Sequence, residues 1–134
     1  MEDNLEAEFI AKVTKWAKTQ PDIQMALLVG SHARGDARSS SDIDFVILTE
    51  QPWRYLKDLA WASELGAAER SVTENWGELD SLRVWYSNGQ EVEFGFADRS
   101  WLSDPRDPGT SRVLDDGFRI LFERTELHEG QRSS

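Results

Sequence analysis

Residues 25–48 read MALLVGSHARGDARSSSDIDFVIL. The segment opens with an apolar run, Met25 to Val29, which Gly30 closes. A short apolar run bounded by glycine is typical of a strand that is buried on both faces. A second apolar strand is predicted over residues 43–48, and Asp44 is its one charged interior residue. Two buried strands joined by a polar segment are therefore the starting point for the fold.

Asp42 and Asp44 lie two residues apart at the start of the second strand, so their side chains face the same side of the sheet. Strand rise places their Cα atoms about 6.6 Å apart. If the two carboxylates approach to roughly 4 Å at an effective dielectric of about 20, their repulsion costs on the order of 4 kcal/mol. Either one carboxylate takes up a proton or a divalent cation lies between them. An all-oxygen site in a chain without cysteine favours Mg²⁺.

Gly30 and Ser31 directly follow the first strand. Glycine lets the backbone approach a ligand closely, and the next N–H groups can point toward an anion. Ser31 can donate its hydroxyl to a phosphate oxygen, and Arg34 and Arg38 can neutralise a triphosphate. The segment after the first strand is therefore predicted to bind phosphate.

Phosphoryl-type transfer depends mainly on positioning and charge neutralisation, so a third carboxylate is expected. Glu93 lies between Val92 and Phe94, well inside a predicted strand, where a side chain that only faces solvent needs no such neighbours. Glu91 lies nearer the turn and is the alternative.

Gly30-Ser31, a spacer that contains Ala33-Arg34-Gly35, and Ser41-Asp42-Ile43-Asp44 resemble the signature of the DNA polymerase beta superfamily of nucleotidyltransferases. The similarity is greatest to the aminoglycoside adenylyltransferase-like and minimal nucleotidyltransferases, and it is strongest over residues 25–48. It implies an α/β (α+β) fold with a mixed, mainly antiparallel sheet of about five strands and helices on one face.

The resemblance also implies roles for individual residues. Gly30, Ser31, Arg34 and Ser41 would bind the nucleotide, and Asp42, Asp44 and Glu93 would be catalytic and hold Mg²⁺, with two ions expected. The implied reaction transfers a nucleoside monophosphate from a nucleoside triphosphate to an acceptor hydroxyl on a small molecule or protein.

The chain leaves little room for the C-terminal helical domain with which aminoglycoside-modifying relatives hold their acceptor. The acceptor pocket would then come from a second subunit of a homodimer, from a partner protein, or from the loops near Trp53 and Trp101. An alternative is an antitoxin-like minimal nucleotidyltransferase that acts on or binds a helical toxin partner. An exposed apolar patch that includes several tryptophans would favour that alternative.

Other patterns complete the expected fold. Apolar residues recur at helical spacing over residues 5–17, and Pro21 ends that helix. One helix is predicted over residues 52–65, with Gly66 as its stop. A hairpin is predicted over residues 82–96 around Asn88-Gly89, a strong signal for a two-residue turn.

Weaker signals predict a strand over residues 70–73 and a short hairpin between residues 112–114 and 118–122. Residues 103–109 should form a loop. We expect one domain over residues 1–128 and a flexible tail over residues 129–134.

The composition narrows the class of protein. The formal net charge is -10, so no basic surface for duplex nucleic acid is expected. The absence of cysteine excludes disulfides and zinc–thiolate sites. The N-terminal residues resemble neither a signal peptide nor a membrane span, so a cytoplasmic location without membrane association is expected. The six tryptophans are interpreted mainly as packing residues.

Overall fold

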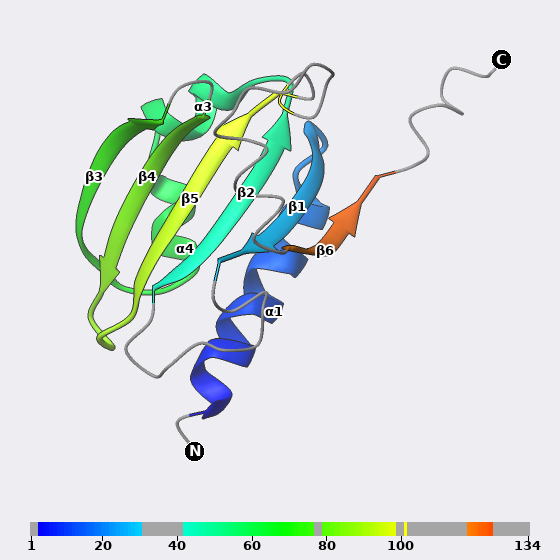
Figure 1. Cartoon of the computed structure of the whole chain (residues 1–134). Helices are drawn as coiled ribbons and strands as arrows, with labels where there is room; N and C mark the ends of the chain where they lie inside the picture. Colours follow the sequence, from blue (N-terminus) through cyan, green and yellow to red (C-terminus); the bar gives the residue numbers. More distant parts are fainter. Residues whose placement is uncertain (1–2, 31–41, 77–78, 99–100, 102–117, 125–134) are drawn as a thin grey trace, which may run out of the picture.

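The computed structural model describes residues 3–30, 42–76, 79–98, 101 and 118–124, with the side chains of residues 3–6 and 76 left out. These residues form one six-stranded sheet with helices against one of its faces (Figure 1). The elements are α1 (Asp3–Thr19), β1 (Ile23–Val29), β2 (Ile43–Thr49), α3 (Pro52–Lys57), α4 (Ala60–Glu64), β3 (Ala68–Trp76), β4 (Leu79–Tyr86), β5 (Glu91–Ala97) and β6 (Phe118–Glu123).

The strand order across the sheet is β3-β4-β5-β2-β1-β6. Only the β2–β5 pair is parallel, and the other four pairs are antiparallel. The predicted mixed, mainly antiparallel sheet with helices on one face is confirmed, with one strand more than the five expected. The parallel pair lies at the centre of the sheet, so β2 and β5 are each covered by a neighbour on both sides.

The main core lies between the sheet and the three helices. Alternate residues of β2, β4 and β5 point toward the helices, which present the apolar face of α1 and aromatic side chains of α3 and α4. Phe45 of β2 stacks on Phe94 of β5 with ring centroids 5.6 Å apart, and Trp61 of α4 meets Phe94 edge-on at 4.8 Å. This aromatic contact joins the two parallel strands on the helix side of the sheet, as large buried aromatics commonly do.

The opposite face of the sheet is apolar only over part of its area. Over β1 and β2 this face carries a smaller cluster of buried apolar residues. Its members are Leu27, Val29, Val46, Leu48, Ala97 and Trp101. The remaining part of this face, toward β3, carries charged residues of β4 and β5. The face opposite the described helices is therefore where polar side chains can gather.

The helix predicted over residues 52–65 is wrong in one respect, because the structure has two short helices there. Asp58 adopts an extended backbone at φ -116° and ψ 113°, and its carboxylate accepts a hydrogen bond from the Ala60 N–H at 3.1 Å. The Trp61 indole N–H donates to the Tyr55 carbonyl at 2.8 Å across the break. A capping side chain and a buried aromatic thus override the continuous helical pattern.

The hairpin between β4 and β5 is confirmed, but its turn differs from the two-residue turn that Asn88-Gly89 suggested. The Gly89 N–H donates to the Tyr86 carbonyl at 3.0 Å, and the Tyr86 N–H donates to the Gln90 carbonyl at 2.9 Å. Gly89 alone has positive φ, at 92°, whereas a two-residue turn of the Asn-Gly type needs positive φ at both residues. The longer turn sets the register of the two strands.

The strand predicted at residues 70–73 is confirmed within β3, which pairs with β4 at one edge of the sheet. At the other edge, β6 pairs with β1. Residues 112–114, predicted as the hairpin partner of β6, and the loop 103–109 lie outside the described residues, as does the tail 129–134. Among the described helices, none combines the length and apolarity needed to cross a bilayer.

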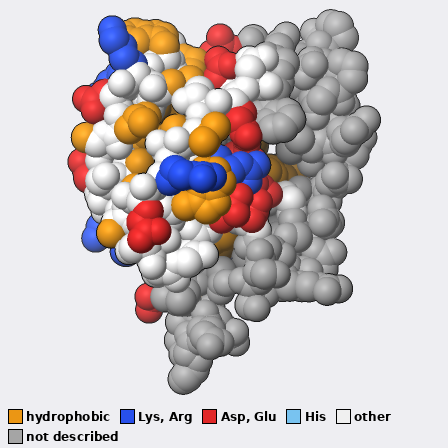
Figure 2. All heavy atoms as spheres, turned by 90° about the vertical axis from the view of Figure 1, so that its left-hand side faces the viewer, with side chains coloured by type: hydrophobic (Ala, Val, Ile, Leu, Met, Phe, Trp, Pro, Cys, Tyr) orange, Lys and Arg blue, Asp and Glu red, His pale blue; other side chains and the backbone are white. Residues whose placement is uncertain are grey.

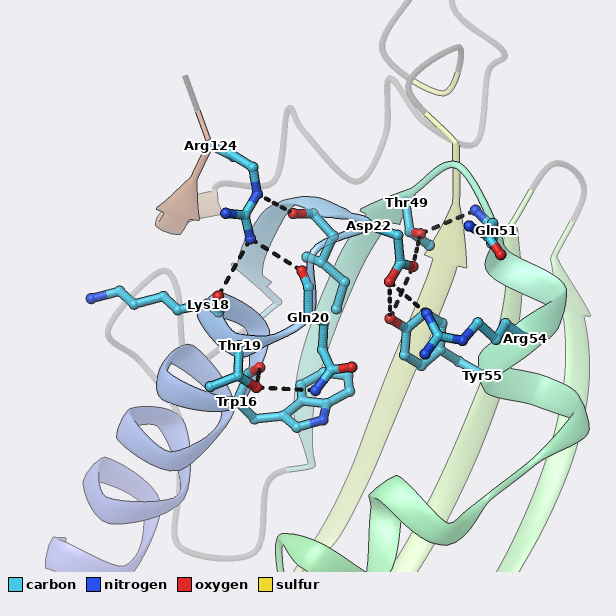
Figure 3. A network of polar contacts seen from close by, with 11 residues as sticks. Trp16, Lys18, Thr19, Gln20, Asp22, Thr49, Gln51, Arg54, Tyr55 and Arg124 are labelled. Atoms are coloured by element: carbon cyan, nitrogen blue, oxygen red, sulfur yellow. Dashed lines mark hydrogen bonds and ion pairs between the residues drawn. The ribbon is translucent and has the colours of Figure 1, made fainter. Parts of the chain in front are cut away.

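A polar network closes the end of the sheet at which α1 ends and β1 begins (Figure 3). Asp22 accepts hydrogen bonds from the Thr49 hydroxyl at 2.6 Å and the Tyr55 hydroxyl at 2.8 Å, and from Arg54 at 2.7 Å. Nearby, the Arg124 guanidinium donates to the backbone carbonyls of residues 20 and 23. These contacts bind β1, β2, α3 and the end of β6 to one another.

The network predicts a pH-dependent stability. Burial by itself would raise the pKa of Asp22, but hydrogen bonds from Thr49 and Tyr55, together with the charge of Arg54, lower that pKa below its ordinary value. A lowered folded-state pKa stabilises the fold above the unfolded-state pKa of about 3.9, and this contribution is lost as the pH falls through the folded-state pKa. Asp22→Asn should lower the free energy of unfolding at pH 7 by about 1 to 3 kcal/mol, and the difference from wild type should shrink below about pH 4.

Urea unfolding at several pH values checks this expectation, with Glu69→Gln at an exposed carboxylate of β3 as the control. A deficit of Asp22→Asn that stays constant down to acidic pH would show that the charge of Asp22 plays no part.

Candidate functional site

Gly30 lies against Asp44 at the end of the β1–β2 pair. Val29 and Asp44 are partners in the antiparallel ladder, so the residue that follows β1 meets the start of β2. Gly30 has φ +77°, and a Cβ atom at this position would lie 2.7 Å from Oδ2 of Asp44. Both the backbone conformation and the space available therefore require glycine at this position.

Asp44, Glu93 and Arg83 lie side by side across the face of the sheet opposite the described helices. Asp44 of β2 is the ladder partner of Glu93 of β5, and Glu93 is the ladder partner of Arg83 of β4. Directly opposite residues of paired strands share a face of the sheet. The structure therefore brings together Asp44 and the carboxylate that sequence reasoning selected on a strand nearly fifty residues away.

The guanidinium of Arg83 binds the surrounding carboxylates. Its Nη1 donates to Oδ2 of Asp42 at 2.9 Å and to Oε2 of Glu91 at 2.8 Å, and its Nη2 donates to Oε1 of Glu93 at 2.8 Å. Its Nε lies 3.6 Å from Oε1 of Glu74, on β3. One largely buried cation is thus shared by acidic side chains from β3, β5 and the start of β2.

The charges around Asp44 change its protonation. Burial, followed by the negative charges of Glu93 and Asp42, raises the pKa of Asp44 to about 7, and the positive charge of Arg83 acts in the opposite direction. Burial by itself disfavours the charged form of Arg83, but the hydrogen bond to Glu91 and the charge of Glu93 raise the pKa of Arg83 above its ordinary value. The site therefore carries more negative charge than its one cation neutralises.

The other predicted site residues are placed as follows. Asp42 and Asp44 face the same side of the sheet, as predicted, and Glu91 and Glu93 both contact Arg83. Ser31, Arg34, Arg38 and Ser41 lie outside the described residues.

Sequence reasoning missed Arg83, although its position between Leu82 and Val84 is the same signal that selected Glu93. It also missed the Ser81 hydroxyl, which donates to Oε2 of Glu93 at 2.9 Å. Ser81 is buried, and its hydrogen bond fixes the second oxygen of the Glu93 carboxylate. Both contacts depend on the register between β4 and β5, which the turn at Gly89 sets.

The donor set suits a hard divalent cation. Among the described residues, no group of three or more Asp, Glu or His side chains is already arranged around a single metal position. Five carboxylates nevertheless surround the one guanidinium, from Asp42, Asp44, Glu74, Glu91 and Glu93. Oxygen donors with excess negative charge fit Mg²⁺, and one of them, Asp44, has a pKa raised by burial and by the neighbouring carboxylates.

On the side of the molecule at the β3 edge, basic and acidic side chains lie next to one another beside a hydrophobic surface (Figure 2). There the Arg70 guanidinium lies over the Trp85 ring, 4.1 Å from its centroid. Trp85 is the ladder partner of Glu91, so this aromatic contact borders the carboxylates. The charged site therefore continues to the edge of the sheet.

Two of the solved structures with a similar fold serve as examples. One is an aminoglycoside 6-adenyltransferase from Bacillus subtilis, which is similar with a TM-score of 0.53 and 11% identity over 66% of this chain and 33% of that one. The other is the polymerase core of TRAMP, an RNA surveillance complex, with a TM-score of 0.53 and 21% identity over 79% of this chain and 37% of that one. At these identities the similarity shows a shared fold, and this chain spans about a third of the length of each.

A family model described as polymerase beta, nucleotidyltransferase matches residues 11–75. Residues 11–75, just under half of the chain, are thus similar in sequence to the polymerase beta-like nucleotidyltransferases. The matched segment contains Gly30, Asp42 and Asp44, whereas Arg83 and Glu93 lie beyond it. No curated protein sequence matches the chain.

The contact between Gly30 and Asp44 predicts an effect that a second glycine can calibrate. Gly30→Ala and Gly89→Ala both place an L side chain at positive φ, which costs about 1 to 2 kcal/mol. Nothing lies within 4 Å of a Cβ at Gly89, whereas the Cβ at Gly30 meets Asp44. Gly30→Ala should therefore lower the free energy of unfolding more than Gly89→Ala does, as measured by urea unfolding.

A further variant separates the cost of positive φ from the cost of the contact with the Asp44 carboxylate. In a chain that already carries Asp44→Ala, Gly30→Ala should lower the free energy of unfolding by about as much as Gly89→Ala does in wild type, because the Cβ at residue 30 no longer meets a carboxylate. Equal losses for the two single glycine variants would mean that Asp44 does not constrain residue 30.

Proposed function

We propose that this domain is a Mg²⁺-dependent nucleotidyltransferase that moves a nucleoside monophosphate from a nucleoside triphosphate to an acceptor hydroxyl. The observation that carries the proposal is the row of Gly30, Asp44 and Glu93, because it joins the family-matched segment to a third carboxylate on an adjacent strand. In this reaction the acceptor oxygen forms a bond to the α-phosphorus. The bond from that phosphorus to the oxygen bridging the α- and β-phosphates breaks, and pyrophosphate leaves.

Asp42, Asp44 and Glu93 are the side chains that would hold Mg²⁺. When bound, the metal would neutralise charge on the triphosphate and on the leaving pyrophosphate. Asp44 lies at the centre of the row and is already disfavoured in its charged form, so a cation that relieves the repulsion stabilises its carboxylate.

Glu93 is preferred over Glu91 as the third carboxylate for two reasons. It is the ladder partner of Asp44, and after burial it is the largest cause of the raised pKa of Asp44, whereas Glu91 contributes least. Glu93 can also accept the proton of the acceptor hydroxyl, because its Oε2 is oriented by Ser81.

The phosphate end of the substrate is assigned to Gly30, Ser31, Arg34 and Ser41. Gly30 supports this role through its positive φ and its missing side chain, which leave backbone accessible beside Asp44. The roles of Ser31, Arg34 and Ser41 rest on the sequence signature.

The alternative function, binding or modifying a helical toxin partner, would be favoured by a patch of exposed tryptophans. Among the tryptophans whose side chains are described, Trp53 alone is exposed, whereas Trp16, Trp61 and Trp101 are buried. The described surface therefore favours transfer chemistry as the primary function. A protein acceptor stays compatible with it.

Transfer by the wild-type chain is tested with nucleoside triphosphates labelled at the α-phosphate. Purified protein is incubated in cell extract with Mg²⁺ and labelled ATP, CTP, GTP or UTP in turn. Label should appear on an acceptor with at least one of the four. Labelling should stop when EDTA is present.

Asp44→Asn should abolish this labelling while the chain stays folded. The loss should reach about 100-fold or more, because the central charge of the site is removed. The free energy of unfolding in EDTA at pH 8 should stay the same or rise, because asparagine removes like-charge repulsion. Undiminished labelling by a folded Asp44→Asn variant would overturn the proposed function, and loss of folding would indicate a structural carboxylate.

Paired amide substitutions identify the third carboxylate. Glu93→Gln should lower the rate of labelling about 100-fold or more, whereas Glu91→Gln should lower it less than about tenfold. Glu69→Gln, an exposed position on β3, is the control and should not change the rate. The reverse ranking of Glu91 and Glu93 would assign the third carboxylate to Glu91.

A further inference from the structure

Arg83 binds two of the three carboxylates that the proposed function assigns to Mg²⁺, those of Asp42 and Glu93. The carboxylates of Asp42, Glu91 and Glu93 accept hydrogen bonds from the guanidinium of Arg83 at 2.8 to 2.9 Å. We propose that Arg83 is an internal counter-ion of this site, which holds the carboxylates together without metal and gives up Asp42 and Glu93 when a divalent metal ion binds. This inference rests on the proposed function, since it concerns the same carboxylates.

Arg83 and a metal ion compete for the same oxygen atoms. Oδ2 of Asp42 and Oε1 of Glu93 each accept a hydrogen bond from the guanidinium. The guanidinium remains charged at any working pH and has no lone pair to offer a metal, so it can only oppose a cation bound at those oxygens. Metal binding therefore requires these two ion pairs to lengthen or break.

The structure provides other partners for Arg83, and one of them, Glu74 on β3, lies on the side away from Asp44. Oε1 of Glu74 is buried and accepts no hydrogen bond, although it lies only 3.6 Å from Nε of Arg83. Glu91 already binds Nη1 at 2.8 Å. Glu74 on β3 and Glu91 on β5 can therefore retain the guanidinium when Asp42 and Glu93 turn to a metal ion.

Two properties follow from this exchange. The carboxylates stay close together in the metal-free chain, because one cation offsets part of their repulsion. A metal ion by itself binds weakly, because it must displace a cation that is already bound. The affinity for a divalent ion is therefore limited by Arg83 and not only by the number of carboxylates.

The experiment measures binding of Mn²⁺, used as the probe, to the full chain by the electron paramagnetic resonance signal of the free ion. Arg83→Met should bind Mn²⁺ at least about tenfold more tightly than wild type, because the competing charge is gone. Arg83→Lys retains a cation and should stay within about threefold of wild type. Arg119→Met removes the same charge from β6, where residue 119 faces the helix side of the sheet, and should leave the affinity unchanged.

A stability measurement separates this role from simple packing. Arg83→Met should unfold at a lower temperature than wild type in EDTA, and Mn²⁺ should raise its unfolding temperature by more than it raises that of wild type. A purely structural arginine would give the first effect without the second. An affinity of folded Arg83→Met equal to or weaker than that of wild type would overturn the proposal.

The wild-type chain gives a test that does not depend on how Arg83→Met folds. The N–H resonances of the Arg83 side chain should shift when Mg²⁺ is added, and unchanged resonances at saturating Mg²⁺ would also overturn the proposal. The Mn²⁺ affinity of Asp44→Asn tests the proposed function separately from the role of Arg83. If that variant binds Mn²⁺ as tightly as wild type, the metal site is not at these carboxylates, and both inferences fail.

Discussion

The aromatic packing of β2 against β5 is the contact on which the rest of the site depends. Phe45 and Phe94 stack on the helix side of two neighbouring parallel strands, and Trp61 covers Phe94 from α4. Side chains alternate between the two faces of a strand, so this packing forces the residues before them, Asp44 and Glu93, together on the opposite face. Burial of large aromatic rings thus opposes the repulsion between two carboxylates.

Arg83 resolves part of the resulting conflict. Its guanidinium accounts for one positive charge among carboxylates from three segments, and the pKa of Asp44 still rises to about 7. The combination of burial and residual repulsion is unfavourable for a purely structural cluster. It is useful at a site that must bind a cation reversibly, because the free energy stored in the repulsion is released when the cation binds.

The contact between Gly30 and Asp44 places the carboxylates next to backbone that can receive an anion. Positive φ turns the chain away from β1, and the absence of a side chain leaves Asp44 in its position. An acidic chain with a formal charge of -10 repels a triphosphate over most of its surface, so attraction has to be local. In the proposed function, a bound cation and the backbone that follows Gly30 would provide that attraction without a basic surface.

The sequence by itself determined the elements whose signals are local. The buried strands, the amphipathic helix α1, the shared face of Asp42 and Asp44, and the identity of Glu93 as an unusual strand carboxylate all follow from alternation and spacing within one segment. The superfamily signature is likewise contained in one continuous stretch. Only the tertiary structure decided the parallel pairing of β2 with β5, which puts Asp44 beside Glu93, because a contact between distant segments leaves no local pattern.

The role of Arg83 was decided in the same way, by a register. A two-residue turn at Asn88-Gly89 would place Arg83 opposite Phe94, whereas the longer turn places it opposite Glu93. A shift of one residue exchanges the two faces of a strand, and the aromatic core accepts only the register that buries Phe94. Asn88-Gly89 predicted where the turn lies but not its length. Packing across the whole sheet determined the register and therefore which side chains meet.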